Sequence, residues 1–207
     1  CVWGGPCDVA QAIWKVQTTR TAEQVAGFKR KIRVHSIIDQ DRTALWVKEK
    51  HPDVFWIFSQ QFRGFFREGD QALVSPEWLE RNVRTGHGPL GLIYPPKASG
   101  VVGVKEGDTP AFLYVLPDGL SDPERPEWGN WGGRFERSGR GNEFVTAQDL
   151  RDGAPDKLYP VHRWRTAYQN DFEARMDWCV KPFAEANHAP GADNDRVFLA
   201  FDGLGST

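Results

Sequence analysis

The chain has 207 residues, of which 40% are hydrophobic, and its formal charge is −2 at pH 7. This length suits one α/β domain with a short appendage. The nearly balanced charge excludes a general electrostatic attraction to nucleic acid or to an anionic membrane. No apolar run approaches the roughly 18 residues of a membrane span. The chain opens on an apolar, strand-like segment, so we expect no signal peptide.

The first sixty or so residues alternate between strand and helix patterns. The predicted strands are 1–3, 32–38 and 54–60, and the predicted helices are 9–16, 21–31 and 42–52. Thr21 is expected to be the N-cap of the second helix. Alternation with short turns predicts a parallel sheet that helices cover on both faces.

The pattern loosens after Gln60. A helix is predicted at 75–84, followed by a loop at 85–96. Residues 97–140 are rich in glycine, proline, aspartate and tryptophan, with one strand-like run at 111–116. An irregular stretch of this length is usually functional or disordered, and its aromatic residues argue against disorder.

The last predicted helix spans 170–183, and the tail is expected to hold a linker and one strand. We therefore divide the chain into a domain at 1–190 and a tail at 191–207. The fold class is α/β, with an open, mainly parallel sheet whose first strands are missing. Because parallel sheets are normally covered on both faces, we expect a separate N-terminal segment or another chain to supply those strands.

Ligands of open α/β sheets bind beyond the carboxyl ends of the strands. Five stretches are candidates for this region: GGPCD (4–8), SIIDQD (36–41), KEGDTP (105–110), EWGNWGGRFE (127–136) and the pair Asn170-Asp171. The glycine-rich turn lacks the spacing and the lysine of phosphate loops, but its carbonyls are suited to a hard cation. Asp39 or Asp41 is expected to cap the next helix.

Two of these stretches offer side chains for a polar ligand. Trp128 and Trp131 flank Asn130, and Glu136 follows six residues after Asn130. The tryptophans either stack on a sugar or base or anchor the loop to the core. Asp108 is a further candidate for substrate binding.

Asn170 and Asp171 are expected at a helix start. There they either cap the helix or direct two oxygen-bearing side chains into a pocket. The three cysteines, Cys1, Cys7 and Cys179, have no spacing typical of a zinc site or a disulfide framework. One disulfide and a remaining thiol are compatible with that count.

Several long motifs resemble a single family. They are VWGGPCDVAQAIWKV, IRVHSIIDQD, VSPEWLERNVRTGHGPLGLIYP, EGDTPAFLYVLPDGLSDPERPEWGNWGGRFE and WRTAYQNDFEARMDW. In this order they are similar to the nucleoside-hydrolase-like domain of bacterial and fungal proteins described as cellulose-binding. The resemblance covers roughly residues 2–190 and implies the C-terminal part of that domain.

The resemblance implies a metal-dependent hydrolase with Ca²⁺ as its cofactor. Asp171 would be a carboxylate ligand of the ion, and the main-chain carbonyl of Cys7 would be another ligand. Asn170 would be a catalytic residue, standing where nucleoside hydrolases carry the histidine that serves the leaving base. This departure from the family pattern puts release of a purine or pyrimidine in doubt. Asn130 and Glu136 would hold the sugar hydroxyls.

The expected reaction is cleavage of an N-glycosidic or related glycosidic bond by a calcium-positioned water. The expected partners are a small-molecule glycoside or carbohydrate and the N-terminal segment of the same precursor as a separate chain. No nucleic acid or membrane is expected as a partner. Relatives are often exported, which favours a secreted or periplasmic location.

Two other functions remain open. One is a non-catalytic carbohydrate-binding domain that uses Trp128 and Trp131 as a platform. The other is an autoprocessed, amidase-like enzyme in which Cys1 is an N-terminal nucleophile and its α-amine is the base. Simple proteolytic processing or an arbitrary chain start would also place a cysteine at position 1.

Overall fold

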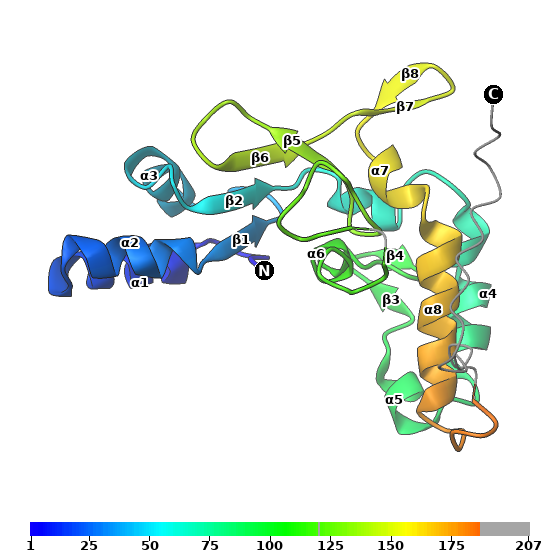
Figure 1. Cartoon of the computed structure of the whole chain (residues 1–207). Helices are drawn as coiled ribbons and strands as arrows, with labels where there is room; N and C mark the ends of the chain where they lie inside the picture. The colour runs from blue at the N-terminus through cyan, green and yellow to red at the C-terminus, as the bar shows by residue number, and fades with distance from the viewer. Residues whose placement is uncertain (120, 187–207) are drawn as a thin grey trace, which may run out of the picture.

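The computed structural model describes residues 1–119 and 121–186. Its main sheet has the strand order β1-β2-β6-β5 (Figure 1). These strands are β1 (Arg33–Ser36), β2 (Phe55–Phe58), β5 (Phe135–Arg137) and β6 (Glu143–Thr146). β2 runs parallel to both β1 and β6, whereas β5 is antiparallel to β6. The predicted open, mainly parallel α/β sheet is therefore confirmed, and its antiparallel edge strand makes it mixed.

A short segment at Val2 extends the sheet beside β1. The Val2 N–H donates to the carbonyl of His35 at 2.8 Å, and the Ile37 N–H donates to the carbonyl of Val2 at 3.2 Å. The predicted strand at 1–3 is thus reduced to one parallel bridge, between Val2 and Ser36. Completion of the sheet by a further segment or chain stays a prediction.

One face of the sheet is covered by α1 (Cys7–Thr19) and α3 (Thr43–Lys50), and α2 (Ala22–Arg30) lies alongside α1 (Figure 1). The core between them contains Ala10, Ile13, Val34, Ala44, Val47, Val54 and Trp56. Thr21 is the N-cap of α2 and forms a capping box with Gln24, as the sequence predicts for the cap.

The opposite face packs against α6 (Thr109–Leu113) and the residue that ends it. Tyr114 joins Phe55, Ile57, Phe135 and Phe144 in a second core cluster. The strand predicted at 111–116 is therefore wrong. A short, wholly apolar run has the same pattern in a helix and in a buried strand, and here Phe112 and Val115 are apolar but exposed, so apolar residues do not mark the buried face.

The rest of the described chain forms a helical region beside the sheet (Figure 1). It contains η1 (Phe62–Phe65), η2 (Gln71–Val74), α4 (Pro76–Leu79), the π-helical turn η3 (Glu80–Arg84), α5 (Gly88–Ile93), α7 (Tyr159–His162) and α8 (Arg165–Trp178). Two hairpins accompany it, β3 (Lys97–Ala98) with β4 (Val101–Val102) and β7 (Asp149–Arg151) with β8 (Ala154–Asp156). Its core contains Phe65, Val74, Trp78, Leu79, Val83, Val104, Leu113, Val161, Tyr168 and Met176.

Two boundaries differ from the sequence prediction. The loop predicted at 85–96 contains α5, and the helix predicted to begin at residue 170 begins at Arg165. Asn170 and Asp171 therefore lie within α8 and do not cap it. The tail predicted at 191–207 lies outside the described residues. Within 1–119 and 121–186, no helix has the length and apolar character that crossing a membrane requires.

Candidate functional site

A cavity of about 570 Å³ lies between α5, α6 and α8. Its walls are mostly apolar and aromatic, and a few polar groups enter it, which is typical of small-molecule sites. The apolar walls include Phe65, Val83, Leu90, Ile93, Leu113, Leu116, Phe172 and Met176. The polar lining comes from α8 and from the segment that leads into α6.

α8 directs one of its faces at this cavity. Tyr168, Asp171, Phe172, Arg175 and Met176 all line it, and their spacing of three and four residues places them on one side of a helix. The Asp171 carboxylate accepts a hydrogen bond from Nε of Arg175 at 2.7 Å. Asp171 therefore brings a negative charge to the cavity wall, held by a neighbour one turn away.

A second carboxylate lines the cavity from another element. Glu106 lies just before α6 and accepts hydrogen bonds from the hydroxyls of Tyr94 and Thr109. The Thr109 bond measures 2.8 Å. Burial and the bond to Glu106 raise the pKa of Tyr94 well above its usual value, so this phenol stays a donor. The cavity thus presents two carboxylates, Glu106 and Asp171, on different elements.

Gln169 supplies a buried acceptor that has no partner. Its side chain is fully buried and lines the cavity, and its Nε2 donates to the carbonyl of Leu73. Its Oε1 accepts no hydrogen bond within the described residues. A buried unpaired acceptor is costly, so Gln169 is a candidate to accept a hydrogen bond from a ligand once its side chain adjusts. The residues predicted from the sequence, Asn170 and Asp171, lie one and two positions later, and no sequence pattern indicated Gln169.

The other predicted residues near this cavity are outside it. Asn170 is exposed on α8 and does not line the cavity. Asp108 is exposed at the N-terminus of α6. Burial and the nearby charge of Glu106 raise the pKa of Asp108 above its usual value. The Cys1 thiol lies against α6, with Sγ 3.6 Å from the carbonyl of Ala111.

The glycine-rich turn receives a carboxylate from its own chain. A Cβ added at Gly5 would lie 1.8 Å from Oδ2 of Asp41, so glycine is required for this approach. Asp41 accepts hydrogen bonds from the hydroxyl and the N–H of Thr43, the first residue of α3, at 2.8 Å from the N–H. Its pKa is lowered chiefly by the Thr43 hydroxyl, with smaller effects from main-chain hydrogen bonds that include Cys7. The N-cap of α3 is Arg42, which makes no side-chain capping bond, so Asp41 bonds to the start of the helix from one residue before the cap.

Cys7 and Asp171, the two predicted metal ligands, line different hollows. Cys7 borders a surface hollow between α1 and α3, whereas Asp171 faces the cavity beside α8. In the described part of the chain, no three histidine, cysteine, aspartate or glutamate side chains are grouped closely enough to hold a metal ion. The residues present therefore do not form a calcium site by themselves, and we derive no chemical step from calcium.

Asn130 is buried within its own loop. Its Nδ2 donates to the carbonyl of Tyr114 at 2.7 Å and to the hydroxyl of Ser121 at 2.9 Å. Its Oδ1 accepts from the N–H of Gly132 at 2.8 Å. Half-buried Trp131 packs against the core of the helical region. In this structure both residues anchor the loop.

Trp128 and Glu136 are exposed. The Trp128 side chain is 65% exposed, and Glu136 is exposed on β5. The structure therefore separates the predicted tryptophan pair, since Trp128 is available to a large ligand and Trp131 is largely covered. The three cysteines are free and exposed.

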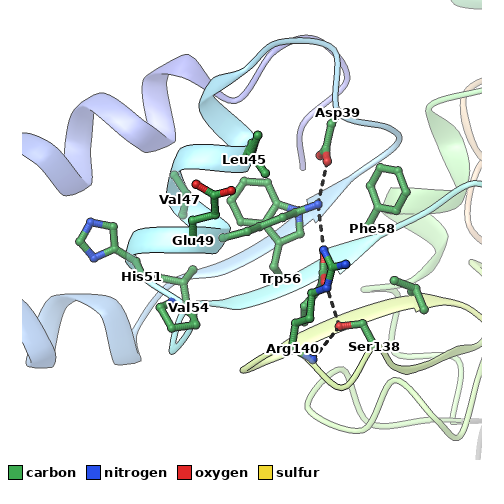
Figure 2. A pocket seen from close by; sticks show the side chains of 14 residues that line it. Asp39, Leu45, Val47, Glu49, His51, Val54, Trp56, Phe58, Ser138 and Arg140 are labelled. Atoms are coloured by element: carbon green, nitrogen blue, oxygen red, sulfur yellow. Dashed lines mark hydrogen bonds and ion pairs between the residues drawn. The ribbon is translucent and has the colours of Figure 1, made fainter.

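A second cavity, of about 510 Å³, lies between α3 and the β5–β6 hairpin (Figure 2). Asp39 and Arg140 point into it from opposite sides (Figure 2). In its lining, Nζ of Lys48 is 2.8 Å from Oδ2 of Asp39 and 3.0 Å from Oε1 of Glu143. The same ammonium lies 4.5 Å from the ring centroid of Phe58. We regard the cavity beside α8 as the better candidate site, because its walls are mostly apolar and aromatic, as is typical of small-molecule sites.

Residues 1–135 match the family described as "Cellulose-binding Sde182, nucleoside hydrolase-like domain". The chain belongs to this family. It is also similar to a solved structure of a nucleoside hydrolase-related hypothetical protein from Saccharophagus degradans, whose description associates it with carbohydrate metabolism. That match has 32% sequence identity and a TM-score of 0.67. It covers 90% of this chain and 46% of the other, so the chain spans less than half of that protein. No curated protein matches the chain.

Proposed function

We propose that this member of the nucleoside-hydrolase-like family binds a glycoside in the cavity between α5, α6 and α8. The observation that carries the proposal is that two carboxylates, Glu106 and Asp171, line one mostly apolar cavity together with Gln169, a buried side chain whose Oε1 has no hydrogen-bond partner within the described residues. A sugar supplies several hydroxyl donors for such acceptors and apolar C–H faces for aromatic walls. The volume, about 570 Å³, lies within the usual range for small-molecule sites.

We also propose that this site contributes to hydrolysis of the glycosidic bond. Cleavage builds positive charge on the sugar ring, and fixed anionic groups nearby stabilise that charge. Asp171 on α8 and Glu106 just before α6 both line the cavity and are the anionic groups proposed for this role. The bond between the anomeric carbon and the leaving oxygen or nitrogen breaks, and a water oxygen bonds to that carbon. The water gives one proton to solvent, and the leaving atom takes one proton from solvent.

Binding is tested by calorimetric titration with cello-oligosaccharides and with a nucleoside. Asp171→Asn removes a charged acceptor and is expected to weaken binding about tenfold. The matched control is Asp177→Asn, on the same helix, because Asp177 also pairs with a residue four positions later, Lys181 at 2.7 Å. Equal affinities of wild type and Asp171→Asn, or equal loss in both variants, would reject the site.

Hydrolysis is tested separately with nitrophenyl glycosides and inosine. Glu106→Gln is expected to lower the rate about a hundredfold or more if Glu106 stabilises the developing charge. Binding that persists with no measurable turnover in the wild type would reject the hydrolytic part and leave the binding part standing.

The exposure of Trp128 favours a second candidate, a non-catalytic platform for polysaccharide. Flat aromatic faces stack on sugar rings, and this indole is open to a large ligand. In a cellulose pull-down, Trp128→Ala is expected to release the protein while Asp171→Asn remains bound. Retention of Trp128→Ala on cellulose would exclude the platform.

Calcium, a separate N-terminal chain and export stay predictions from the family resemblance. Asp171 and Cys7 line different hollows, so they do not hold one calcium ion together. A calcium site at either residue would require several further oxygen ligands. Calcium titration by calorimetry tests the idea, and the proposed binding of a glycoside does not depend on it.

A further inference from the structure

A basic hollow of about 550 Å³ lies beside η1 and the β3–β4 hairpin. Its lining consists of Phe62, Arg63, Phe66, Arg67, Ala98, Ser99, Val101, Lys105 and Gly107. Three of these side chains are cationic and none is acidic. The hollow is thus unlike the other two cavities, each of which contains carboxylates.

The segment that leads into α6 separates this hollow from the glycoside cavity. Lys105 and Gly107 line the basic hollow, whereas Glu106 and Thr109 line the cavity. Consecutive residues of this segment therefore face two different sites: Lys105 faces the basic hollow and Glu106 faces the cavity that contains carboxylates. The two sites are distinct but share a wall.

The carboxylates nearest in sequence to the cations are engaged elsewhere. Glu68, next to Arg67, lies 3.7 Å from Nη1 of Arg151. Asp70 accepts from the N–H of Ala72 at 2.9 Å, where it caps η2. Glu106 is held by two hydroxyl donors on the cavity side. None of these carboxylates therefore neutralises a cation of the hollow by direct pairing.

Asp108, the remaining carboxylate close in sequence, is influenced more by another anion than by these cations. Burial and the charge of Glu106 raise its pKa, whereas a close cation would lower it. Within the described residues, no ion pair joins Arg63, Arg67 or Lys105 to a carboxylate.

Half-buried Phe62 and Phe66 also line the hollow, and together they are its aromatic floor. A Cβ at Gly107 would lie 3.5 Å from one atom of the Phe62 ring and 3.9 Å from one atom of the Phe66 ring, so Gly107 lies beside both rings. The guanidinium carbon of Arg63 is 5.3 Å from the centroid of Phe62. Arginine and lysine donors beside ring faces suit a ligand that combines an anionic group with a ring.

We propose that the hollow formed by Arg63, Arg67, Lys105 and the two phenylalanines binds an anionic sugar, either a uronic acid or a sugar phosphate. The guanidinium groups and the ammonium hold the carboxylate or phosphate, and the sugar ring lies against the aromatic floor. This site is separate from the glycoside cavity and does not require hydrolysis there.

Calorimetric titration of the wild-type protein with glucuronate, glucose 6-phosphate and glucose tests the proposal. At least one anion is expected to bind ten times or more tightly than glucose, and a comparison of the two anions identifies the acidic group preferred. Added salt is expected to weaken anion binding. If neither anion binds more tightly than glucose, the proposal is overturned.

The double variant Arg67→Gln/Lys105→Gln is expected to lose at least tenfold in affinity for the anion. The control is Lys15→Gln/Arg20→Gln, which removes the same charge from exposed positions on and just beyond α1. An equal loss of anion affinity in the two double variants would show that only the net charge of the protein matters, and would overturn the proposal of a site in this hollow. Asp171→Asn is expected to leave anion binding unchanged, which distinguishes failure of this site from failure of the glycoside cavity.

Discussion

Arg165 is buried, and its guanidinium serves main-chain carbonyls. It is 1% exposed, and its Nη2 donates to the carbonyls of Gly64 at 2.7 Å and Arg67 at 2.9 Å. Its Nη1 donates to the carbonyls of Glu68 and Asp70. One side chain on α8 therefore fixes the loop that follows η1. A guanidinium suits this role because it presents several donors in a rigid plane.

Arg165→Met is expected to lower the free energy of unfolding by roughly 2–4 kcal/mol, because buried carbonyls lose their donors. Urea denaturation followed by circular dichroism measures this loss. The control is Arg163→Met, since the Arg163 side chain is 42% exposed and its removal is expected to cost less than about 0.5 kcal/mol. Similar midpoints for wild type and Arg165→Met would contradict the assignment.

Asn130 was predicted to orient a sugar, and the structure shows its amide engaged within the loop. Asn130→Ala removes three hydrogen bonds of a buried side chain and is expected to cost roughly 2–3 kcal/mol of stability. Thermal unfolding measures this, and cello-oligosaccharide titration below the melting temperature measures binding. A variant of unchanged stability that no longer binds sugar would restore the predicted role in recognition.

At the scale of elements, α6 joins the sheet to the glycoside cavity. Its Leu113 lines that cavity, and Tyr114, which follows, packs on the sheet. The loop carrying Asn130 lies directly against it, since a Cβ at Gly132 would meet the carbonyl of Pro110 at 2.3 Å and the nitrogen of Tyr114 at 2.4 Å. The main chain of the loop therefore packs against the main chain of α6. An added side-chain atom at Gly132 would have to displace backbone, because no flexible side chain lies there to move aside.

Gly132→Ala is expected to destabilise the protein by about 3 kcal/mol or more, because overpacking here shifts α6 or the loop. It is also expected to weaken glycoside binding at temperatures where the variant is folded. Gly4→Ala is the control, since a Cβ there has no atom within 4 Å. Unchanged stability of Gly132→Ala would show that the contact is looser than described.

At the scale of the whole molecule, the core contains an imidazole that resists protonation. His35 lies in β1 and is 6% exposed, with ring centroids of Tyr114 and Phe135 at 5.2 and 5.3 Å. Neither ring nitrogen has a hydrogen-bond partner within the described residues. Burial, and to a lesser degree the charge of the N-terminal amine, lowers the pKa of His35 from 6.5 to about 3.

A lowered folded-state pKa makes stability fall as the pH falls, because the unfolded chain binds a proton that the folded protein does not. For His35 the window runs from 6.5 down to about 3, with a slope of about 1.4 kcal/mol per pH unit. His35→Leu is expected to flatten this dependence and to be neutral or stabilising at pH 7. Urea denaturation across the window measures both. His51 and His162, whose pKa values are also lowered, remain in the variant, so parallel profiles would contradict the assignment to His35.

The local sequence pattern predicted a helix or strand correctly where the segment has a clear hydrophobic period and recognisable end signals. The helices at 21–31 and 42–52 and the strands at 32–38 and 54–60 match α2, α3, β1 and β2 within a few residues. The pattern failed at 111–116, where every residue is apolar although Phe112 and Val115 are exposed, and at the start of α8. There the sequence suggested a cap at Asn170, while the helix begins at Arg165.

The sequence by itself determined the α/β class, the parallel order of the early strands, the capping of α2 by Thr21, and the family. These features depend on residues close together in the chain, or on motifs whose order along the chain identifies the family. Only the tertiary structure decided that Glu106 and Asp171 face one cavity, that Gln169 has an unpaired acceptor, and that Arg63, Arg67 and Lys105 share a hollow. Such groupings join segments distant in sequence, and their energies depend on burial and on the charges around them, which no local pattern contains.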